Sequence, residues 1–281
     1  MKMNTTNILK TLCLTFLFIS CQTNSKTVNY YFDSVNGNDN NEGISIEKPF
    51  KTLKKIQEIN LRSGDSILLS NGSSFKGNIK IIDKKNIHLS NYNPKILGNP
   101  IIDSKGHIAG IYIENSSEVS LSNINIRANG GGIFEEYKNL TTNKITDKAI
   151  MRAGVLVNVS KNEIFKNILV KNIDVSDIFF EDSGFTRNPG EVRTAMGTQA
   201  YGFGVRFFNS SKSGSIHNIN VLDCRVENVS HTGIKMTSSS KARFKNIVVS
   251  NNKLRRTGGP SIQFSRVEDL HVYGNDVKYS G

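Results

Sequence analysis

Residues 204–207 read Gly-Val-Arg-Phe, and residues 233–236 read Gly-Ile-Lys-Met. In each stretch a glycine precedes an apolar residue, a variable residue and a second apolar residue, and a polar turn then leads into another apolar alternation. The same order recurs at 110–113 and 154–157 and, with serine in place of glycine, at 261–264. Self-similarity of this kind is typical of a solenoid, in which each repeat adds one turn to a continuous stack.

The repeating unit is a set of short strands, because apolar and variable residues alternate with a period of two. No single copy can bury its apolar side alone, so successive copies must stack about 4.8 Å apart. The motif starts lie 44, 50, 29 and 28 residues apart, which places insertions near 130–152 and 178–202. We therefore predict an all-β fold over residues 30–281, a single-stranded right-handed parallel β-helix with its coils at 77–281.

The N-terminal part, residues 30–76, is expected to cap this solenoid. After Pro49, apolar residues at helical spacing over 50–59 predict an amphipathic helix that covers the open end of the stack. The polar loop at 36–43 lacks the dense alternating carboxylates of a calcium loop, which favours a plain capping loop.

The first 21 residues have the pattern of a targeting segment. Lys2 and Lys10 precede an apolar run, and Phe-Ile-Ser-Cys at 18–21 resembles a bacterial lipoprotein cleavage box. This predicts a lipid on Cys21, a tether over 22–29, and a place in the cell envelope, either periplasmic or at the cell surface. An ordinary secretory signal with an incidental Cys21 is the alternative.

The mature chain would be strongly basic, since loss of the two leader lysines lowers the formal charge only from +12 to +10. For an exported protein this favours an acidic polysaccharide as partner and excludes nucleic acid, although lysines that simply coat the solvent faces would give the same charge. Cys224 is the one cysteine left outside the leader, so no intramolecular disulfide is possible. Its apolar surroundings predict a core thiol.

Three segments carry a resemblance to a known family: YYFDSVNGNDNNEG at 30–43, KPFKTLKKI at 48–56 and SGDSILLSNGSSFKG at 63–77. With the repeats behind them, they resemble the pectin-lyase-like right-handed β-helix proteins, common among polysaccharide-degrading lipoproteins of bacteria. The resemblance implies the fold. It leaves the reaction open, because that superfamily contains polysaccharide lyases, glycoside hydrolases and a few epimerases or esterases.

Alignment of the repeats predicts one outward side chain per coil on a common line: Lys80, Tyr112, Leu156, Arg206, Lys235 and Gln263. Arg206 and Lys235 would then be neighbours about 5 Å apart, and their repulsion calls for an anion. A uronate or sulfate group of a glycan would supply it. Acidic residues of the 178–202 segment would do so equally well.

Residues of the neighbouring corners are expected to join this pair on one side of the solenoid. The predicted catalytic residues are Arg206, His231, Lys235 and Arg256, and the predicted substrate contacts are Tyr201, Arg187, Arg193, Arg255 and Gln263. Glu181 and Asp182 are the predicted ligands of a calcium ion, if one is used.

This composition suits β-elimination, which needs a cation for the uronate carboxylate, a base for the C5 proton and an acid for the leaving oxygen. Lys235 is assigned as the base, with Arg256 or Arg266 as the acid. In the alginate-lyase and chondroitinase-like branch of the resembled family, a lysine and an arginine from neighbouring coils fill these roles, often near calcium. The Asn-Lys-Ser signature of that branch is absent, since residues 233–237 read Gly-Ile-Lys-Met-Thr.

Two alternatives remain open. Hydrolysis needs two carboxyl groups, and the sequence offers Glu181, Asp182, Glu191, Asp223, Glu227, Glu268 and Asp269 without selecting a pair. Of these, Asp223 and Glu227 are expected to face solvent. A non-catalytic glycan-binding surface protein would also suit the pattern. The sequence ends within a copy of the repeated motif, which suggests a fragment of a longer β-helix or an end covered by another chain.

Overall fold

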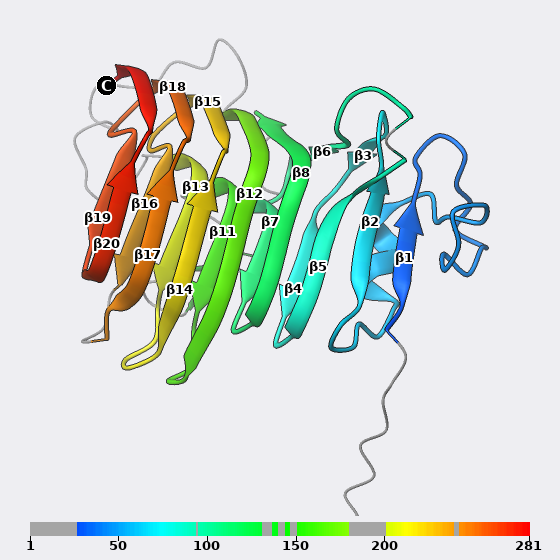
Figure 1. The fold of residues 1–281 in the computed structure, drawn as a ribbon, viewed down its shortest axis with the longest axis horizontal. Coiled ribbons are helices and arrows are strands. Elements are labelled where there is room, and N and C mark those ends of the chain that lie inside the picture. The colour runs from blue at the N-terminus through cyan, green and yellow to red at the C-terminus, as the bar shows by residue number, and fades with distance from the viewer. Residues whose placement is uncertain are drawn as a thin grey trace, which may run out of the picture.

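The computed structural model describes residues 27–93, 95–130, 137–139, 144–146, 151–179, 201–238 and 242–281. It confirms the predicted fold class, because parallel strands stack into successive coils of a right-handed β-helix (Figure 1). The coils follow one another along the long axis of the molecule, from the N-terminal strands in blue to the last coil in red. Each coil contributes strands to three faces.

A 13-stranded sheet forms two of these faces. The first face follows the order β1 (Asn29–Phe32), β2 (Ser66–Ser70), β5 (Lys85–Tyr92), β8 (Ser117–Asn129), β12 (Ile164–Phe179), β14 (Ser215–Leu222), β17 (Phe244–Ser250) and β20 (Val267–Tyr273). The second face consists of the C-terminal halves of β8 and β12 together with β3 (Ser74–Lys76), β6 (Ile101–Asp103), β15 (Arg225–Val229), β18 (Lys253–Thr257) and β21 (Asp276–Ser280).

A six-stranded sheet forms the third face. Its strands are β4 (Ile79–Ile82), β7 (Ala109–Glu114), β11 (Met151–Val159), β13 (Tyr201–Asn209), β16 (Ile234–Ser238) and β19 (Ile262–Ser265). An antiparallel pair, β9 (Tyr137–Asn139) and β10 (Lys144–Thr146), lies in the sequence between β8 and β11.

Asparagine and aspartate make the bend between the first and second faces. Asn123, Asn172, Asp223 and Asn251 occupy it with φ of 58°, 50°, 55° and 56°. These residues tolerate the left-handed region that the bend requires. The Asn172 Nδ2 donates to Asn123 Oδ1 over 2.7 Å, so the bend is also held from one coil to the next.

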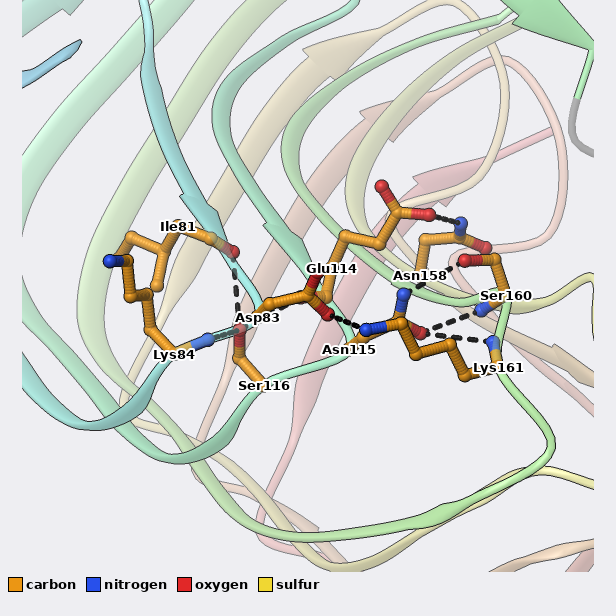
Figure 2. A network of polar contacts seen from close by, with 9 residues as sticks. All are labelled: Ile81, Asp83, Lys84, Glu114, Asn115, Ser116, Asn158, Ser160 and Lys161. Carbon is orange, nitrogen blue, oxygen red and sulfur yellow. Dashed lines mark hydrogen bonds and ion pairs between the residues drawn. The ribbon is translucent and has the colours of Figure 1, made fainter.

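Figure 2 shows the corner between the third and first faces, which is held by side chains rather than by strands. The Asn115 Oδ1 accepts hydrogen bonds from the amides of Ser160 and Lys161 in the next coil, over 2.9 and 3.1 Å. The Lys161 ammonium reaches back two coils to Asp83. Three coils are thereby tied together at one polar corner.

The glycine of the repeated motif is fixed by packing. A Cβ placed on Gly154 would lie 2.4 Å from Cγ1 of Val175, an inward side chain of the second face on β12. The equivalent contacts join Gly110 to Ile126 at 2.4 Å, Gly204 to Val226 at 2.4 Å and Gly233 to Leu254 at 2.5 Å. Real Cβ atoms do not approach other atoms this closely, so these four coils need a residue without a side chain at this point.

The strands that flank both long intervals stay paired with the coils before and after them, although the register of β12 on β8 shifts between Ser176 and Ile178. Ile168 pairs with Val119 of the coil before it and with Ile219 of the coil after it. The coil from β8 to β12 contains residues 131–150, and the coil from β12 to β14 contains residues 180–200. Both intervals therefore fall between a strand of the second face and a strand of the third face.

The interior is a column of Ile, Val, Leu and Phe side chains, most of them fully buried. Cys224 belongs to this column and is 1% exposed, as predicted for a core thiol. Burial raises the pKa of its thiol to about 12, so it is not a nucleophile near neutral pH. A second apolar cluster, which includes Leu156 and Phe203, lies apart from the column and contains outward positions of the third face.

The predicted capping helix is wrong in type and length. The segment forms only a 3₁₀ helix, η1 (Leu53–Gln57), which packs against β4 through buried Leu53 and Ile56. Leu53 and Ile56 are three residues apart, and a 3₁₀ helix, with three residues per turn, places both side chains on one side. The helix cannot begin earlier, because the Asp39 carboxylate holds the amides of Lys51 and Thr52 in a non-helical arrangement. Within the described ranges, no helix is long and apolar enough to cross a membrane.

Two carboxylates bind main-chain amides in and around the polar loop at 36–43. The Asp39 carboxylate accepts hydrogen bonds from Lys51 and Thr52, and the Asp33 carboxylate accepts them from Val35 and Asn36. Burial would raise the pKa of both carboxyl groups, but these hydrogen bonds outweigh it and lower the pKa. The carboxylate oxygen atoms thus accept hydrogen bonds from backbone amides in and beside the loop.

Gly154→Ala should destabilise the protein by about 1–3 kcal/mol, the usual cost of overpacking a dense core. The added methyl group would collide with Val175, so Val175→Ala should recover part of the loss in the double variant. Urea unfolding measures both effects. Ser265→Ala, at an exposed position of the same sheet, is the control. A Gly154→Ala protein as stable as the wild type would contradict this account of the motif.

Candidate functional site

The predicted line of outward residues is confirmed by the strand register of the third face. Leu156 pairs with Arg206, Arg206 with Lys235, and Lys235 with Gln263. Towards the N-terminus the line continues through Tyr112 to Lys80. Arg206 and Lys235 are therefore neighbours on adjacent coils.

Arg206 and Lys235 share an aromatic surface. The Arg206 guanidinium carbon lies 5.0 Å from the ring centre of Phe203 and 5.2 Å from that of Phe208, and the Lys235 Nζ lies 5.6 Å from the ring centre of Phe203. Arg206 is 6% exposed, and its Nη1 donates to Thr237 Oγ1 over 2.9 Å. Ring faces attract cations, which offsets part of the repulsion between the two positive groups.

His231 completes the group from the corner before β16. Its ring lies 5.3 Å from the ring of Phe203, and its Nδ1 is 2.7 Å from Thr232 Oγ1. Burial, then the charges of Lys235 and Arg206, lower the pKa of His231 to about 4. The imidazole is therefore neutral at physiological pH. We call Arg206, His231 and Lys235 the cationic site.

Lys235 is half-buried, and its surroundings disfavour its charge. Burial is the larger cause and the Arg206 charge the second, and both lower the pKa of the ammonium group. No ion pair joins Lys235 to an acid in the described part of the chain. A lysine in such an environment gives up its proton more readily than an exposed one, as a general base requires.

Arg255 and Arg256 do not join the cationic site, contrary to the prediction. They lie on β18 in the second face, where Arg255 binds Asp276 and Arg256 binds Glu227. Arg256 has a φ of 48°, so the chain bends at this residue before the corner that leads to the third face. The guanidinium group is thereby held by the neighbouring coil of its own face.

Several predicted site residues lie outside the described residues: Glu181, Asp182, Arg187, Arg193 and, in the leader, Cys21. Tyr201 is the first residue of β13, and only its backbone is described. Gln263 lies beside Lys235, as predicted. Among the residues that the structure describes, no group of three or more His, Cys, Asp or Glu side chains could hold a metal ion.

Arg152 is a structural residue that the sequence alone did not reveal. It is fully buried, and its guanidinium donates to the carbonyl oxygens of His107, Gly130 and Phe179. Gly130 and Phe179 are the last described residues before the segments 131–150 and 180–200. One side chain thus fixes the points where both segments leave the solenoid. A lone arginine within the apolar motif of β11 would have been the available signal.

The second face carries an acidic group that includes Asp174, which sequence reasoning also missed. Burial raises the pKa of the Asp174 carboxyl, the Arg225 charge opposes this, and the charges of Glu227 and Asp177 add to it. Arg225 contacts both Asp174, over 3.9 Å, and Glu227. Glu227 was expected to face solvent, but its side chain is only 14% exposed between Arg225 and Arg256.

Comparison with known protein families identifies the family to which this fold belongs. The family model of the right-handed β-helix region matches residues 109–277, which is more than half of the chain. The chain belongs to the right-handed β-helix family. This membership agrees with the resemblance to pectin-lyase-like proteins in the sequence.

Similar proteins include carbohydrate-active members of the β-helix fold. A lacto-N-biosidase of Bifidobacterium longum subsp. longum is 37% identical over 92 residues, which cover 30% of this chain and 6% of that enzyme. Two crystal structures of the GH136 lacto-N-biosidase from Eubacterium ramulus match with TM-scores of 0.63 and 0.55 at 18% and 14% identity. They cover 85% and 89% of this β-helix chain, and 43% and 56% of the enzyme chains. This chain thus spans about half of the Eubacterium enzyme and a small part of the Bifidobacterium enzyme, and the structural likeness shows the fold alone.

Lys235→Met should raise the pKa of His231 from about 4 towards its ordinary value of 6.5, because it removes a neighbouring positive charge and keeps the site covered. NMR titration of the histidine ring protons measures this shift. Lys253→Met, which removes an exposed lysine of the second face, should leave the His231 titration unchanged. An unchanged pKa in the Lys235→Met protein would show that the two side chains are not neighbours in solution.

Proposed function

We propose that this protein is a carbohydrate-active β-helix protein that cleaves an acidic polysaccharide by β-elimination at the cationic site. One observation carries the proposal: two cations from adjacent coils, Arg206 and Lys235, are held side by side over one ring, and the pKa of the lysine is lowered. An acidic sugar supplies the negative charge that this arrangement favours.

Each side chain has a role in such a reaction. Arg206 remains charged and binds the uronate carboxylate, which stabilises the negative charge that develops as the C5 proton leaves. The neutral amine of Lys235 takes this proton, the C4–O4 bond breaks as the C4–C5 double bond forms, and the Lys235 ammonium returns the proton to O4. His231, neutral near pH 7, offers a ring nitrogen to a sugar hydroxyl without adding charge.

Hydrolysis is the second candidate, and the second face supplies a specific observation for it. A glycoside hydrolase needs one protonated and one ionised carboxyl group. The raised pKa of Asp174 suits the acid, and the two arginines that bind Glu227 suit an ionised partner. Local similarity to a lacto-N-biosidase supports this class of reaction.

The purified mature protein should release unsaturated sugars from at least one of alginate, pectate, chondroitin or ulvan, detected by ultraviolet absorbance together with reducing ends. Lys235→Met should lower kcat by roughly 100-fold or more, in line with the loss of a general base, and Lys253→Met should not. Reducing ends without absorbance, abolished by Asp174→Asn and not by Lys235→Met, would establish hydrolysis instead. No product from any polymer would contradict both reactions and leave a glycan-binding role.

We further propose that the protein is anchored in the cell envelope by a lipid on Cys21, a residue outside the described ranges. Cys21→Ser should move the protein from the detergent-extractable membrane fraction to the soluble fraction, because it removes the acylated thiol. Cell fractionation and immunoblotting measure the distribution, and Cys13→Ser is the matched control within the leader. A Cys21→Ser protein that stays in the membrane fraction would rule out this anchor.

A further inference from the structure

Thr237 lies beside the cationic site and has no role in it so far. It stands on β16, two residues after Lys235, and its half-buried side chain points outward from the third face. The strand register pairs it with Phe208 and Ser265 on the neighbouring strands β13 and β19 (Figure 1). Its Oγ1 accepts the hydrogen bond from Arg206 Nη1 over 2.9 Å. A hydroxyl group of one coil thus holds the guanidinium group of the coil before it.

Three described contacts hold the Arg206 guanidinium. Its central carbon lies 5.0 Å from the ring centre of Phe203 and 5.2 Å from that of Phe208, and the Thr237 hydroxyl provides the hydrogen bond. A ring attracts a cation anywhere over its face, whereas a hydrogen bond also fixes the direction of the N–H group. Among these contacts, the one with Thr237 therefore sets the orientation of the guanidinium.

The position of this guanidinium matters to the other two members of the cationic site. Burial is the larger cause of the lowered pKa of Lys235, and the Arg206 charge is the second. The pKa of His231 is lowered by burial, then by the charges of Lys235 and Arg206. Because the interaction between charges weakens with distance, a guanidinium that moved away would bring both pKa values closer to their ordinary range.

Threonine on a paired strand is well suited to hold a charged group in one place. A side chain that branches at Cβ has few χ1 rotamers, so the strand itself places the hydroxyl. Strand β16 is paired on both sides, with β13 and with β19, which fixes its backbone. The acceptor is thus in place before any ligand arrives.

We propose that Thr237 is a positioning residue of the cationic site, which acts through Arg206 by holding its guanidinium beside Lys235. The inference rests on the proposed function, in which Arg206 binds the uronate carboxylate and Lys235 takes the C5 proton. The hydroxyl of Thr237 then determines where the carboxylate lies relative to the amine. A displaced guanidinium would stabilise the developing negative charge less well.

The titration of His231, followed by NMR of its ring protons, reports the position of Arg206 without any substrate. Thr237→Val removes the acceptor and keeps the shape of the side chain. The pKa of His231 should then rise from about 4, because repulsion moves the released guanidinium away from the other two groups. Thr237→Ser keeps the hydroxyl and should leave the titration unchanged. Ser265→Ala, which removes an exposed hydroxyl from the next coil of the same line, is the control.

A second background shows whether Thr237 acts through Arg206. Arg206→Met removes the guanidinium charge and should by itself raise the pKa of His231. Adding Thr237→Val to it should cause no further rise, because the group that Thr237 holds is gone. Valine suits a strand, and a thermal melt checks that each variant folds. Thr237→Ala, which also lacks the acceptor, replaces Thr237→Val if the latter does not fold.

Kinetics provide an independent measurement on any polymer that the wild type cleaves. Thr237→Val should lower kcat about tenfold, the effect of one hydrogen bond to a charged group. KM should change less, because the guanidinium stabilises most strongly the charge that develops in the transition state. Thr237→Ser should keep most of the activity.

The proposal is wrong if His231 titrates in the Thr237→Val protein as it does in the wild type. It is also wrong if the rise caused by Thr237→Val persists in full in the Arg206→Met background, or if Thr237→Ser behaves like Thr237→Val. Failure of the elimination assay would contradict the proposed function alone, because the titration locates Arg206 in the absence of substrate.

Discussion

The whole structure depends on one constraint, namely that each coil must lie in register on the coil before it, about 4.8 Å away. A side chain that points inward therefore meets the same kind of side chain above and below. The glycines at 110, 154, 204 and 233 show how tight the packing is, since each leaves room for an aliphatic group of the second face. The strands before and after residues 131–150 and 180–200 remain paired within the stack.

This constraint explains what could be predicted from the sequence. Alternation tells which residues face outward, and register then aligns them, so the line from Lys80 to Gln263 and the contact between Arg206 and Lys235 followed from pattern alone. Alternation does not tell at which residue a coil turns from one face to the next. Arg256 was misplaced for this reason, and its positive φ is the kind of local bend that an apolar period cannot reveal.

Other features depended on contacts between distant segments. Arg152 binds carbonyl groups more than 20 residues away, and Asp174 owes its raised pKa to burial, to Glu227 of the next coil and to Asp177 of its own strand. The capping segment has apolar residues at spacings of three, which suit both kinds of helix. The hydrogen bonds that the amides of Lys51 and Thr52 donate to Asp39 limited it to a short 3₁₀ helix.

The second and third faces differ in how their charged side chains are arranged. On the second face, positive and negative side chains pair across the coils, as Arg127 does with Asp103 and Arg255 with Asp276. On the third face, Arg206 and Lys235 stand together over Phe203, and the pKa of Lys235 is lowered. A scaffold that can neutralise its charges on one face, and gathers like charges on another, concentrates its electrostatic potential where a ligand would use it.

Arg152 has a consequence for how such a protein can change over evolutionary time. Among the described residues, the atoms that its guanidinium binds at Gly130 and Phe179 are main-chain oxygens, so these two bonds do not depend on the side chains of the segments that start there. Those segments can be lengthened, shortened or exchanged while Gly130 and Phe179, from which they start, stay in place. The solenoid can in this way accept different loops at this corner while its coils stay the same.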